Sequence, residues 1–211
     1  QLVCGFAGKR WKVSIAVMVA KDEGITKIHR MRIIQLLEAD LNFTLACIFG
    51  SRTMRFAEEF CTMNASQYGG RRGAVCQSAV LNKVLSYEIS RLLKEPVAGS
   101  ELDATGCYDR MIPDLVQVTC ERLGTPPEPC NMLMEILYEM VHKVRTKYGD
   151  SVKHYHSTID KVLYGTGQGS GGSPFFWNST ADVILHGMEK RSKGCRYHSA
   201  AGRVKSERIE D

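Results

Sequence analysis

Gly165-Thr-Gly-Gln-Gly-Ser-Gly-Gly-Ser-Pro174 is the stretch of this 211-residue chain on which the fold prediction depends. Five glycines stand among its first nine residues, so its backbone can approach another group closely. Pro174 suits the first turn of a helix, which we expect to run to about His186. Residues 152–164 predict one or two strands before the loop. The sequence thus predicts a strand, a glycine loop and a helix whose N-terminus favours an anion.

The hydrophobic periodicity predicts further elements on the N-terminal side of this loop. Strands are expected at residues 11–20, 31–36 and 97–103, and the first two are expected to form a hairpin. Helices are expected within residues 37–63, at 74–93, at 113–122 and at 133–144. Strands and helices are mixed without strict alternation, which favours an α+β fold over a doubly wound parallel sheet.

The composition is that of a globular protein, with 44% hydrophobic and 24% charged residues. No apolar run approaches the roughly 20 residues of a membrane span, and no signal peptide is recognisable. The eight cysteines include no C-x-x-C pair, so we expect reduced thiols and an intracellular protein, in cytoplasm or nucleus, that is not secreted. The net charge of +5 permits an anionic partner without requiring one.

Two segments contain residues suited to chemistry. Asp103 follows the expected strand at 97–103, and a carboxylate fixed at a sheet edge suits Mg²⁺; the alternative is an Asp that caps the following turn. The glycine loop contains one G-x-G-x-x-G pattern, at Gly167, Gly169 and Gly172. That pattern favours a dinucleotide, but the regular βαβ alternation of such a fold is missing, and a flexible hairpin tip is the alternative.

Taken together, these segments resemble reverse transcriptases, and non-LTR retrotransposon enzymes more than retroviral ones. Asp103-x-x-x-x-Tyr108-Asp109 resembles the first catalytic motif of that family, and Gln168-Gly169-x-x-x-Ser173-Pro174 resembles its second signature. Upstream, Lys21 followed by Arg32-Ile-Ile resembles the hairpin of the fingers, and Gln67-Tyr-Gly-Gly-Arg-Arg-Gly73 resembles the loop before a fingers helix. The four segments occur in the order of the family.

Three departures from the family pattern stand out. Ile33 replaces the usual proline of the hairpin, and Gly70 occupies a position where an aromatic residue is common. No Asp-Asp pair, the third catalytic motif of the family, occurs in the sequence. The chain begins with Gln1 and ends at Asp211 in a charged stretch, so we expect an internal segment of a longer protein that is inactive by itself.

The resemblance implies an α+β right-hand polymerase. Residues 1–96 would form the fingers, as a hairpin plus helices, and residues 97–211 the palm with an interleaved fingers segment. The palm sheet would be antiparallel and incomplete, and the thumb would be absent. The partners would be an RNA or DNA template-primer and dNTPs, with no membrane.

The resemblance also implies roles for individual residues. Asp103 would be catalytic and, with the carbonyl of Ala104, would bind two Mg²⁺ ions, as in two-metal nucleotidyl transfer. The remaining roles would be substrate binding by Lys21, Arg32, Tyr108, Gln168 and Gly169, and nucleic-acid binding by Gln67, Arg71 and Arg72. The alternatives are a nucleic-acid-binding module without catalysis and a dinucleotide-dependent oxidoreductase; a viral RNA-dependent RNA polymerase would share the palm chemistry.

Overall fold

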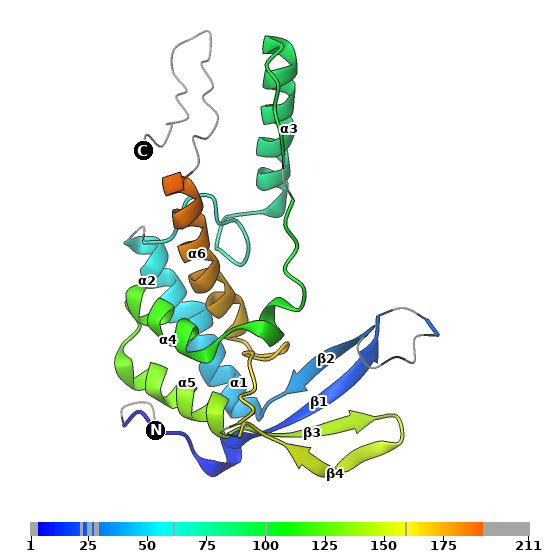
Figure 1. Cartoon of the computed structure of the whole chain (residues 1–211). Coiled ribbons are helices and arrows are strands. Elements are labelled where there is room, and N and C mark those ends of the chain that lie inside the picture. The colour runs from blue at the N-terminus through cyan, green and yellow to red at the C-terminus, as the bar shows by residue number, and fades with distance from the viewer. Residues whose placement is uncertain are drawn as a thin grey trace. The chain divides into compact units, whose positions relative to one another are not determined.

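A computed structural model of the chain describes residues 4–21, 23–24, 27, 30–60, 62–99, 101–158 and 160–191 (Figure 1). Its strands are β1 Val13–Ala20, β2 Met31–Leu36, β3 Val141–Thr146 and β4 Gly149–Tyr155. Its α-helices are α1 Ala39–Leu45, α2 Met54–Glu59, α3 Cys76–Leu93, α4 Pro113–Arg122, α5 Pro127–Glu139 and α6 Ser173–Arg191. Short helical segments among the described residues include 3₁₀ turns at Lys9–Lys12 and Cys107–Arg110 and a π-helical stretch at Ala46–Thr53. The structure is therefore of mixed α and β type, as predicted.

The chain divides into two compact units, each built from two separate segments. The first unit comprises Gln1–Thr62 and Thr105–Thr180, and the second comprises Met63–Ala104 and Ala181–Asp211. Helix α6 therefore begins in the first unit and ends in the second. The assignment of residues 1–96 to fingers and 97–211 to palm stays a prediction.

The sheet of the first unit has the strand order β2-β1-β3-β4. β1 pairs antiparallel with β2, as the predicted hairpin requires, and β3 pairs antiparallel with β4. β1 and β3, however, run parallel, so the expectation of an antiparallel sheet is wrong for this central pair. The reason is the position of α5, which leads into β3 at the end of the sheet where β1 also begins.

An ion-pair cluster fixes this common starting point. Lys12, the last residue before β1, pairs with Glu135 and Glu139 near the end of α5. Glu135 also accepts a hydrogen bond from the backbone N–H of Ala7 at 2.6 Å. The two acidic partners raise the pKa of Lys12, and the hydrogen bonds from Lys12 and Ala7 lower the pKa of Glu135. Because α5 is tied to the segment before β1, the strand that follows α5 enters the sheet in the same direction as β1.

Aromatic packing forms the centre of the helical part of the first unit. Phe49 lies in the π-helical stretch, and its ring centroid is 4.8 Å from Phe176 and 6.4 Å from Phe175 at the start of α6. All three rings are fully buried. α4 packs against α5, and Val116 and Leu133 from these helices are also buried.

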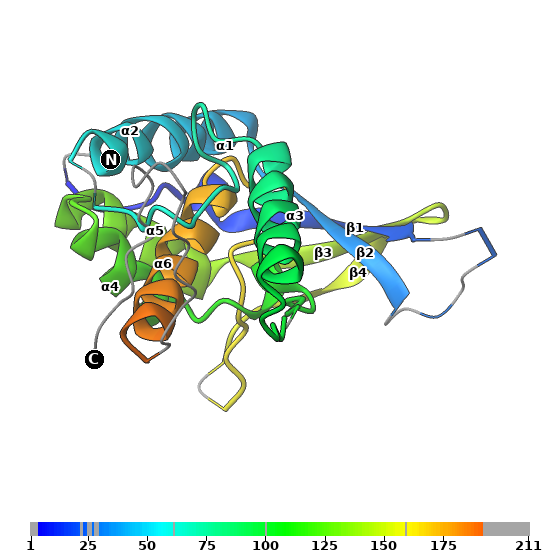
Figure 2. The ribbon, with the colours of Figure 1, turned by 90° about the horizontal axis from the view of Figure 1, so that it is seen from above.

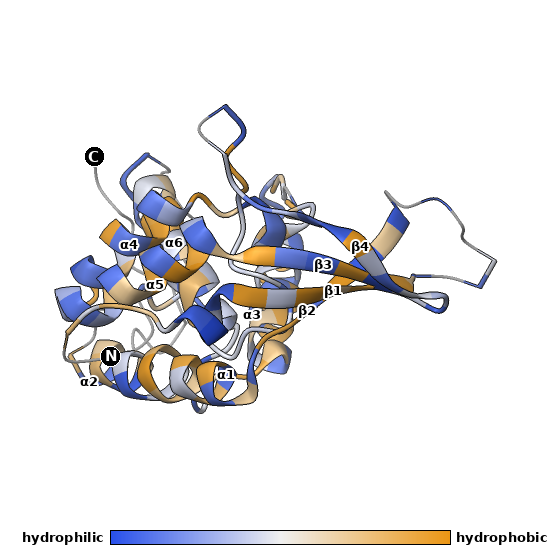
Figure 3. Cartoon of the chain, turned by 90° about the horizontal axis from the view of Figure 1, so that it is seen from below, coloured by the Kyte–Doolittle hydropathy of each residue, from blue (hydrophilic) through white to orange (hydrophobic). Residues whose placement is uncertain are grey.

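The strands extend to one side of the first unit, beyond α1 and α5 (Figure 2). Most of β1 is coloured as hydrophobic in Figure 3. Across the described part of the chain, no helix has both the length and the apolar character to cross a bilayer.

The second unit contains α3 and the C-terminal part of α6. Asp182 on α6 is fully buried and accepts a hydrogen bond of 2.5 Å from the backbone N–H of Asn64. Lys83 on α3 pairs with Glu101. The helix predicted at 74–93 is present as α3, which begins two residues later at Cys76 and ends at Leu93, yet Leu81, Leu85 and their apolar neighbours on this helix are exposed.

Three predicted elements differ from the structure. Of residues 152–164, which predicted one or two strands, only residues 152–155 lie in a strand, β4, and residues 156–158 and 160–164 lie in none. Residues 97–99 and 101–104 form no strand, because Val97 and Leu102 are exposed and no strand pairs with them. The helix expected to reach Val144 ends at Glu139, and residues 141–146 form β3 instead. Val141 and Val144 have the spacing of a helical face, but they pair with β1 instead. This pairing satisfies their backbone N–H and C=O groups within the sheet. Asp103 therefore does not stand at a sheet edge.

The glycine loop packs closely against β2. Gly169 has φ +126°, and a Cβ atom there would lie 2.5 Å from the carbonyl oxygen of Gln35. Gly167 has φ +80°, and a Cβ atom there would overlap the Gln35 side chain. A Cβ on Gly172 would meet the ring of Phe176 at 2.8 Å. The three glycines of the G-x-G-x-x-G pattern thus make room for the protein's own residues.

Gly169→Ala should destabilise the protein more than Gly149→Ala. Gly149, at the β3–β4 turn, has a comparable φ of +118° but open space around its Cβ position, so alanine there adds only backbone strain of about 1–2 kcal/mol. Gly169→Ala adds an overlap with backbone, worth about 1–3 kcal/mol more. Urea unfolding of both variants measures the difference; equal losses would show that the loop does not pack on Gln35.

Candidate functional site

Three of the segments that predicted function meet in the first unit. The backbone N–H of Thr166 donates to the carbonyl oxygen of Tyr108 at 2.8 Å. The N–H of Gly165 donates to Met111 at the same distance, and the N–H of Gln35 on β2 donates to the carbonyl oxygen of Gln168 at 2.7 Å. The glycine loop therefore joins the end of the Asp103–Asp109 motif to the second strand of the hairpin.

Ser173 and Asn42 hold the glycine loop in place. Ser173 is buried, and its Oγ lies 2.8 Å from the carbonyl oxygen of Gly167 and 3.1 Å from that of Thr166. Asn42 on α1 donates through Nδ2 to Gly169 at 3.2 Å and accepts through Oδ1 from the N–H of Gly171 at 2.6 Å. The serine of the Gln168–Pro174 signature thus orders the loop that carries Gln168.

A cavity of about 200 Å³ lies beside this junction. Strand β2, the segments at 109 and 163–165, the end of α5, β3 and β4 all contribute to its wall. Its lining residues are Ile33, Gln35, Asp109, Leu137, Met140, His142, Tyr155, Leu163, Tyr164 and Gly165. The wall therefore combines an apolar base with a few polar groups, which is the usual make-up of a small-ligand site.

His142 on β3 is the most deeply buried titratable group of this wall. Only 7% of its surface is exposed, and burial lowers its pKa to about 4. Its Nδ1 lies 2.6 Å from the hydroxyl oxygen of Ser14, and its ring stacks on Tyr155 with centroids 4.7 Å apart. The imidazole is therefore neutral near pH 7. If the Ser14 hydroxyl donates to Nδ1, then the Nε2–H of this tautomer is a hydrogen-bond donor.

Asp109 is the acidic residue of the cavity lining, and Lys21, which follows β1, interacts with it electrostatically. Desolvation raises the pKa of Asp109, and the positive charge of Lys21 acts in the opposite direction. Desolvation also raises the pKa of Tyr155, and the charge of Asp109 adds to that effect. The pKa of Tyr108 is raised, first by burial and then by Cys107. Lys21 and Asp109 are thus electrostatically coupled, with Tyr108 next to Asp109 in the chain.

The predicted residues are distributed over both units. In the first unit, Lys21, Arg32 and Gly169 are exposed, while Tyr108 and Gln168 are half-buried. Arg32 alternates with the cavity-lining Ile33 and therefore points to the other face of β2. The second unit contains Asp103 and Ala104, which are exposed, together with Gln67, Arg71 and Arg72. Arg71 donates to the backbone carbonyls of Asn64 and Gln67, so it also orders its own turn.

The described residues do not form a complete magnesium site. No three His, Cys, Asp or Glu side chains in the described ranges gather closely enough to hold a metal ion. Asp103 is exposed, and no hydrogen bond or ion pair joins its carboxylate to another described residue. One such carboxylate supplies only part of the oxygen ligands that Mg²⁺ takes.

Sequence patterns missed Gln35, His142 and Tyr155 as members of the site. Gln35 and Ile33 lie on one face of β2, whose other face carries the exposed Arg32 and Leu36 and the half-buried Ile34, and a polar residue on the inward face of a strand is a usable signal. His142 was hidden because the structure places it in a strand where the periodicity predicts a helix. No pattern in the sequence around Tyr155 marks it as a member of the site.

No protein-family model matches the chain, and no curated protein matches it. The functional interpretation therefore depends on the residues and on their geometry.

Protonation of His142 should make stability depend on pH between about 6.5 and 4. Its pKa is about 4 in the folded protein and near 6.5 when unfolded, so the unfolded chain binds the proton first as the pH falls. The free energy of unfolding should thus be insensitive to His142 above pH 6.5 and fall by about 3 kcal/mol by pH 4.

The variant His142→Gln keeps a hydrogen-bonding side chain beside Ser14 but cannot titrate. In urea unfolding at a series of pH values, its free energy of unfolding should fall less steeply over this window than that of the unmodified chain. Identical slopes for the two proteins would contradict the buried, neutral state of His142.

Proposed function

We propose that the chain carries fingers and palm segments of an RNA-directed DNA polymerase of the reverse-transcriptase type, and that its first unit binds the incoming dNTP. The observation that supports this most is the junction of Tyr108, Gln168 and the β2 strand by backbone hydrogen bonds of 2.7–2.8 Å. These segments lie more than 50 residues apart, and each was selected on its own residues. Their meeting at one place is what a shared nucleotide site requires.

The charges in the first unit suit a triphosphate. Lys21 follows β1, and Arg32 lies near the start of β2 on the face opposite Ile33; both are exposed, and neither forms an ion pair with another described residue, so in this proposal the triphosphate lies outside the cavity, at this end of the β1–β2 hairpin. Positive side chains offset the charge that develops when a primer 3′-oxygen attacks the α-phosphorus and pyrophosphate leaves. In this proposal Tyr108 contacts the sugar, Gln168 and Gly169 brace the nucleotide, and Asp109 sets the electrostatic environment of Lys21.

Template contact is proposed for the second unit. Arg72 is exposed, and Gln67 and Arg71 form the turn before α3. A phosphate backbone binds arginine side chains and N–H groups of this kind. Asp103 is proposed as one of the carboxylates for Mg²⁺, with further ligands required. Because nucleic acid and dNTPs are the proposed partners, the proposed location is the cytoplasm or the nucleus.

The chief alternative is a nucleic-acid-binding module without catalysis. It is favoured by one observation, that the described residues form no group of three metal ligands. Such a module would bind a nucleic-acid strand but would have no specific site for a dNTP. Nucleotide binding therefore separates the two functions, and it does not require the chain to be catalytically complete.

Lys21→Met should weaken dNTP binding about tenfold, because a charge-assisted hydrogen bond to phosphate is lost. Calorimetric titration with dTTP at fixed ionic strength measures this. Lys9→Met is the matched control, since Lys9 is also exposed but lies in the 3₁₀ turn before β1. The pKa of Asp109, followed by carboxyl NMR, should rise further in Lys21→Met alone. Equal dTTP affinities of the two variants would favour the non-catalytic module.

Tyr108→Ala should reduce the preference for dTTP over UTP and ribothymidine triphosphate. An aromatic ring beneath the sugar excludes a 2′-hydroxyl, the group that distinguishes RNA from DNA building blocks. Tyr108→Phe retains the ring and should retain the preference, which makes it the matched control. Competition binding with the three nucleotides measures the ratio. Unchanged discrimination in Tyr108→Ala would remove Tyr108 from the proposed sugar contact.

A further inference from the structure

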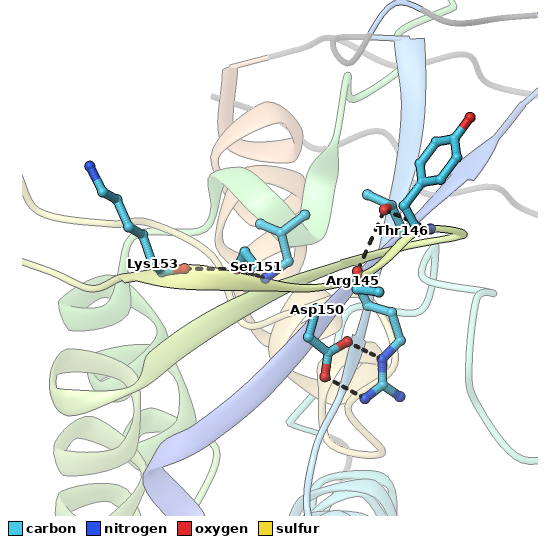
Figure 4. Close-up of polar contacts among 8 residues, drawn as sticks. Arg145, Thr146, Asp150, Ser151 and Lys153 are labelled. Carbon is cyan, nitrogen blue, oxygen red and sulfur yellow. Dashed lines mark hydrogen bonds and ion pairs between the residues drawn. The ribbon is translucent and has the colours of Figure 1, made fainter.

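The β3–β4 hairpin of the first unit ends in a tightly ordered two-residue turn. Thr146 pairs with Gly149, which leaves Lys147 and Tyr148 at the tip. The backbone N–H of Tyr148 donates to Thr146 Oγ1 at 3.2 Å. Arg145 donates through Nε and Nη2 to the two carboxylate oxygens of Asp150, at 2.5 and 2.8 Å (Figure 4). This two-point ion pair clamps the strands just below the tip.

A side chain also compensates for an irregularity in the same hairpin. The strand register shifts between Lys143 and Arg145, as at a β-bulge. The N–H of Val144 donates at 3.0 Å to the hydroxyl oxygen of Ser151, and that hydroxyl donates at 2.7 Å to the carbonyl of Lys153 (Figure 4). Ser151 therefore replaces the missing backbone contact, and the hairpin keeps a defined twist up to its tip.

The tip exposes an aromatic ring within a basic surface. Tyr148 is 87% exposed, and Nζ of Lys147 lies 4.9 Å from the centre of its ring. Residues 143–153 contain four bases and one acid, namely Lys143, Arg145, Lys147, Lys153 and Asp150. The acid is already paired with Arg145, and its pKa is lowered by that pair. Among the described residues, no carboxylate lies within ion-pair distance of the three lysines.

We propose that the β3–β4 hairpin binds a single strand of nucleic acid, with Tyr148 stacking on a base and Lys143, Lys147 and Lys153 near its phosphates. An exposed aromatic ring next to Lys147, with Lys143 and Lys153 further back along the same hairpin, combines the two contacts that single strands offer, a base face and a phosphate charge. An acidic protein would form ion pairs with the lysines but would gain little binding energy from stacking on the Tyr148 ring. The clamped turn orders the backbone that carries the ring before binding, which reduces the entropy lost on association.

This inference takes its ligand class from the proposed function but places the contact on residues that the polymerase resemblance does not include. The hairpin lies in the first unit, whereas the proposed template contacts Gln67, Arg71 and Arg72 lie in the second. The hairpin site and the proposed function can therefore fail separately. An oligonucleotide tests the hairpin site, and a mononucleotide tests the proposed function.

Tyr148→Ala should weaken binding of fluorescein-labelled dT12 and rU12 to the chain about tenfold, the loss expected for one stacked base. Tyr148→Phe keeps the stacking surface and should bind as tightly as the unmodified chain. Fluorescence anisotropy measures both, and a larger effect on one oligonucleotide identifies the preferred strand. Because Tyr148 is 87% exposed at a turn, its truncation leaves the core intact, which thermal unfolding verifies.

Lys147→Gln should lower the slope of log K against log salt by about 0.7, the value for one phosphate contact to a single strand. Lys9→Gln, which removes an exposed lysine outside the hairpin, should leave the slope unchanged. The inference is overturned if Tyr148→Ala binds both oligonucleotides like the unmodified chain, or if an acidic polypeptide such as poly-glutamate binds more tightly than they do. If dTTP binding is absent while the strand effects appear, the proposed function fails and the hairpin site stands.

Discussion

The ion pairs of Lys12 with Glu135 and Glu139 determine how the first unit is arranged. They join the residue before β1 to the end of α5, and only Met140 separates α5 from β3. Because both strands begin at this point, they pair in parallel, a geometry that needs a long crossover between strands. The crossover here contains most of the helices of the chain. Pairing of β3 with β1 over Val141–Arg145 then prevails over the helical periodicity of residues 133–144.

Gln35 links the sheet to the glycine loop in several ways. Its N–H donates to Gln168, its backbone and side chain occupy the space left by Gly169 and Gly167, and its side chain amide lies 3.5 Å from Nδ1 of His142. This packing explains why glycine stands at these positions, and a bound pyrophosphate is not needed to explain it. It argues against the dinucleotide-dependent oxidoreductase, whose loop would use the same glycines to approach its cofactor. It is compatible with a nucleotide held by side chains around the loop.

Local patterns were sufficient to predict the hairpin β1–β2, the helices α3 and α4, and the start of α6 at Ser173-Pro174, because side-chain spacing and proline decide these elements. They failed where long-range contacts decide. Val141 and Val144 fit a helical face, but pairing with β1 makes them a strand; Val97 and Leu102 have strand character, but nothing pairs with them. In the site, the motif residues Tyr108 and Gln168 could be selected from sequence. Gln35 and His142 could not, since their roles arise only when β2, β3 and the loop are brought together.

The parallel pairing of β1 and β3 has a consequence for both proposed ligands. Since Val17 is opposite Arg145, the two strands advance toward the same end of the sheet, where β1 ends next to Lys21 and β3 ends next to Lys147 (Figure 1). An antiparallel arrangement would have placed these lysines at opposite ends. Of the bases proposed for a strand, Lys147 therefore lies at the same end of the sheet as Lys21, whereas Lys143 is paired with Ile15 nearer the start of β1. In the two proposals, the nucleotide contact at Lys21 and the strand contact at Lys147 lie at this one end of the sheet, and neither uses a residue of the second unit.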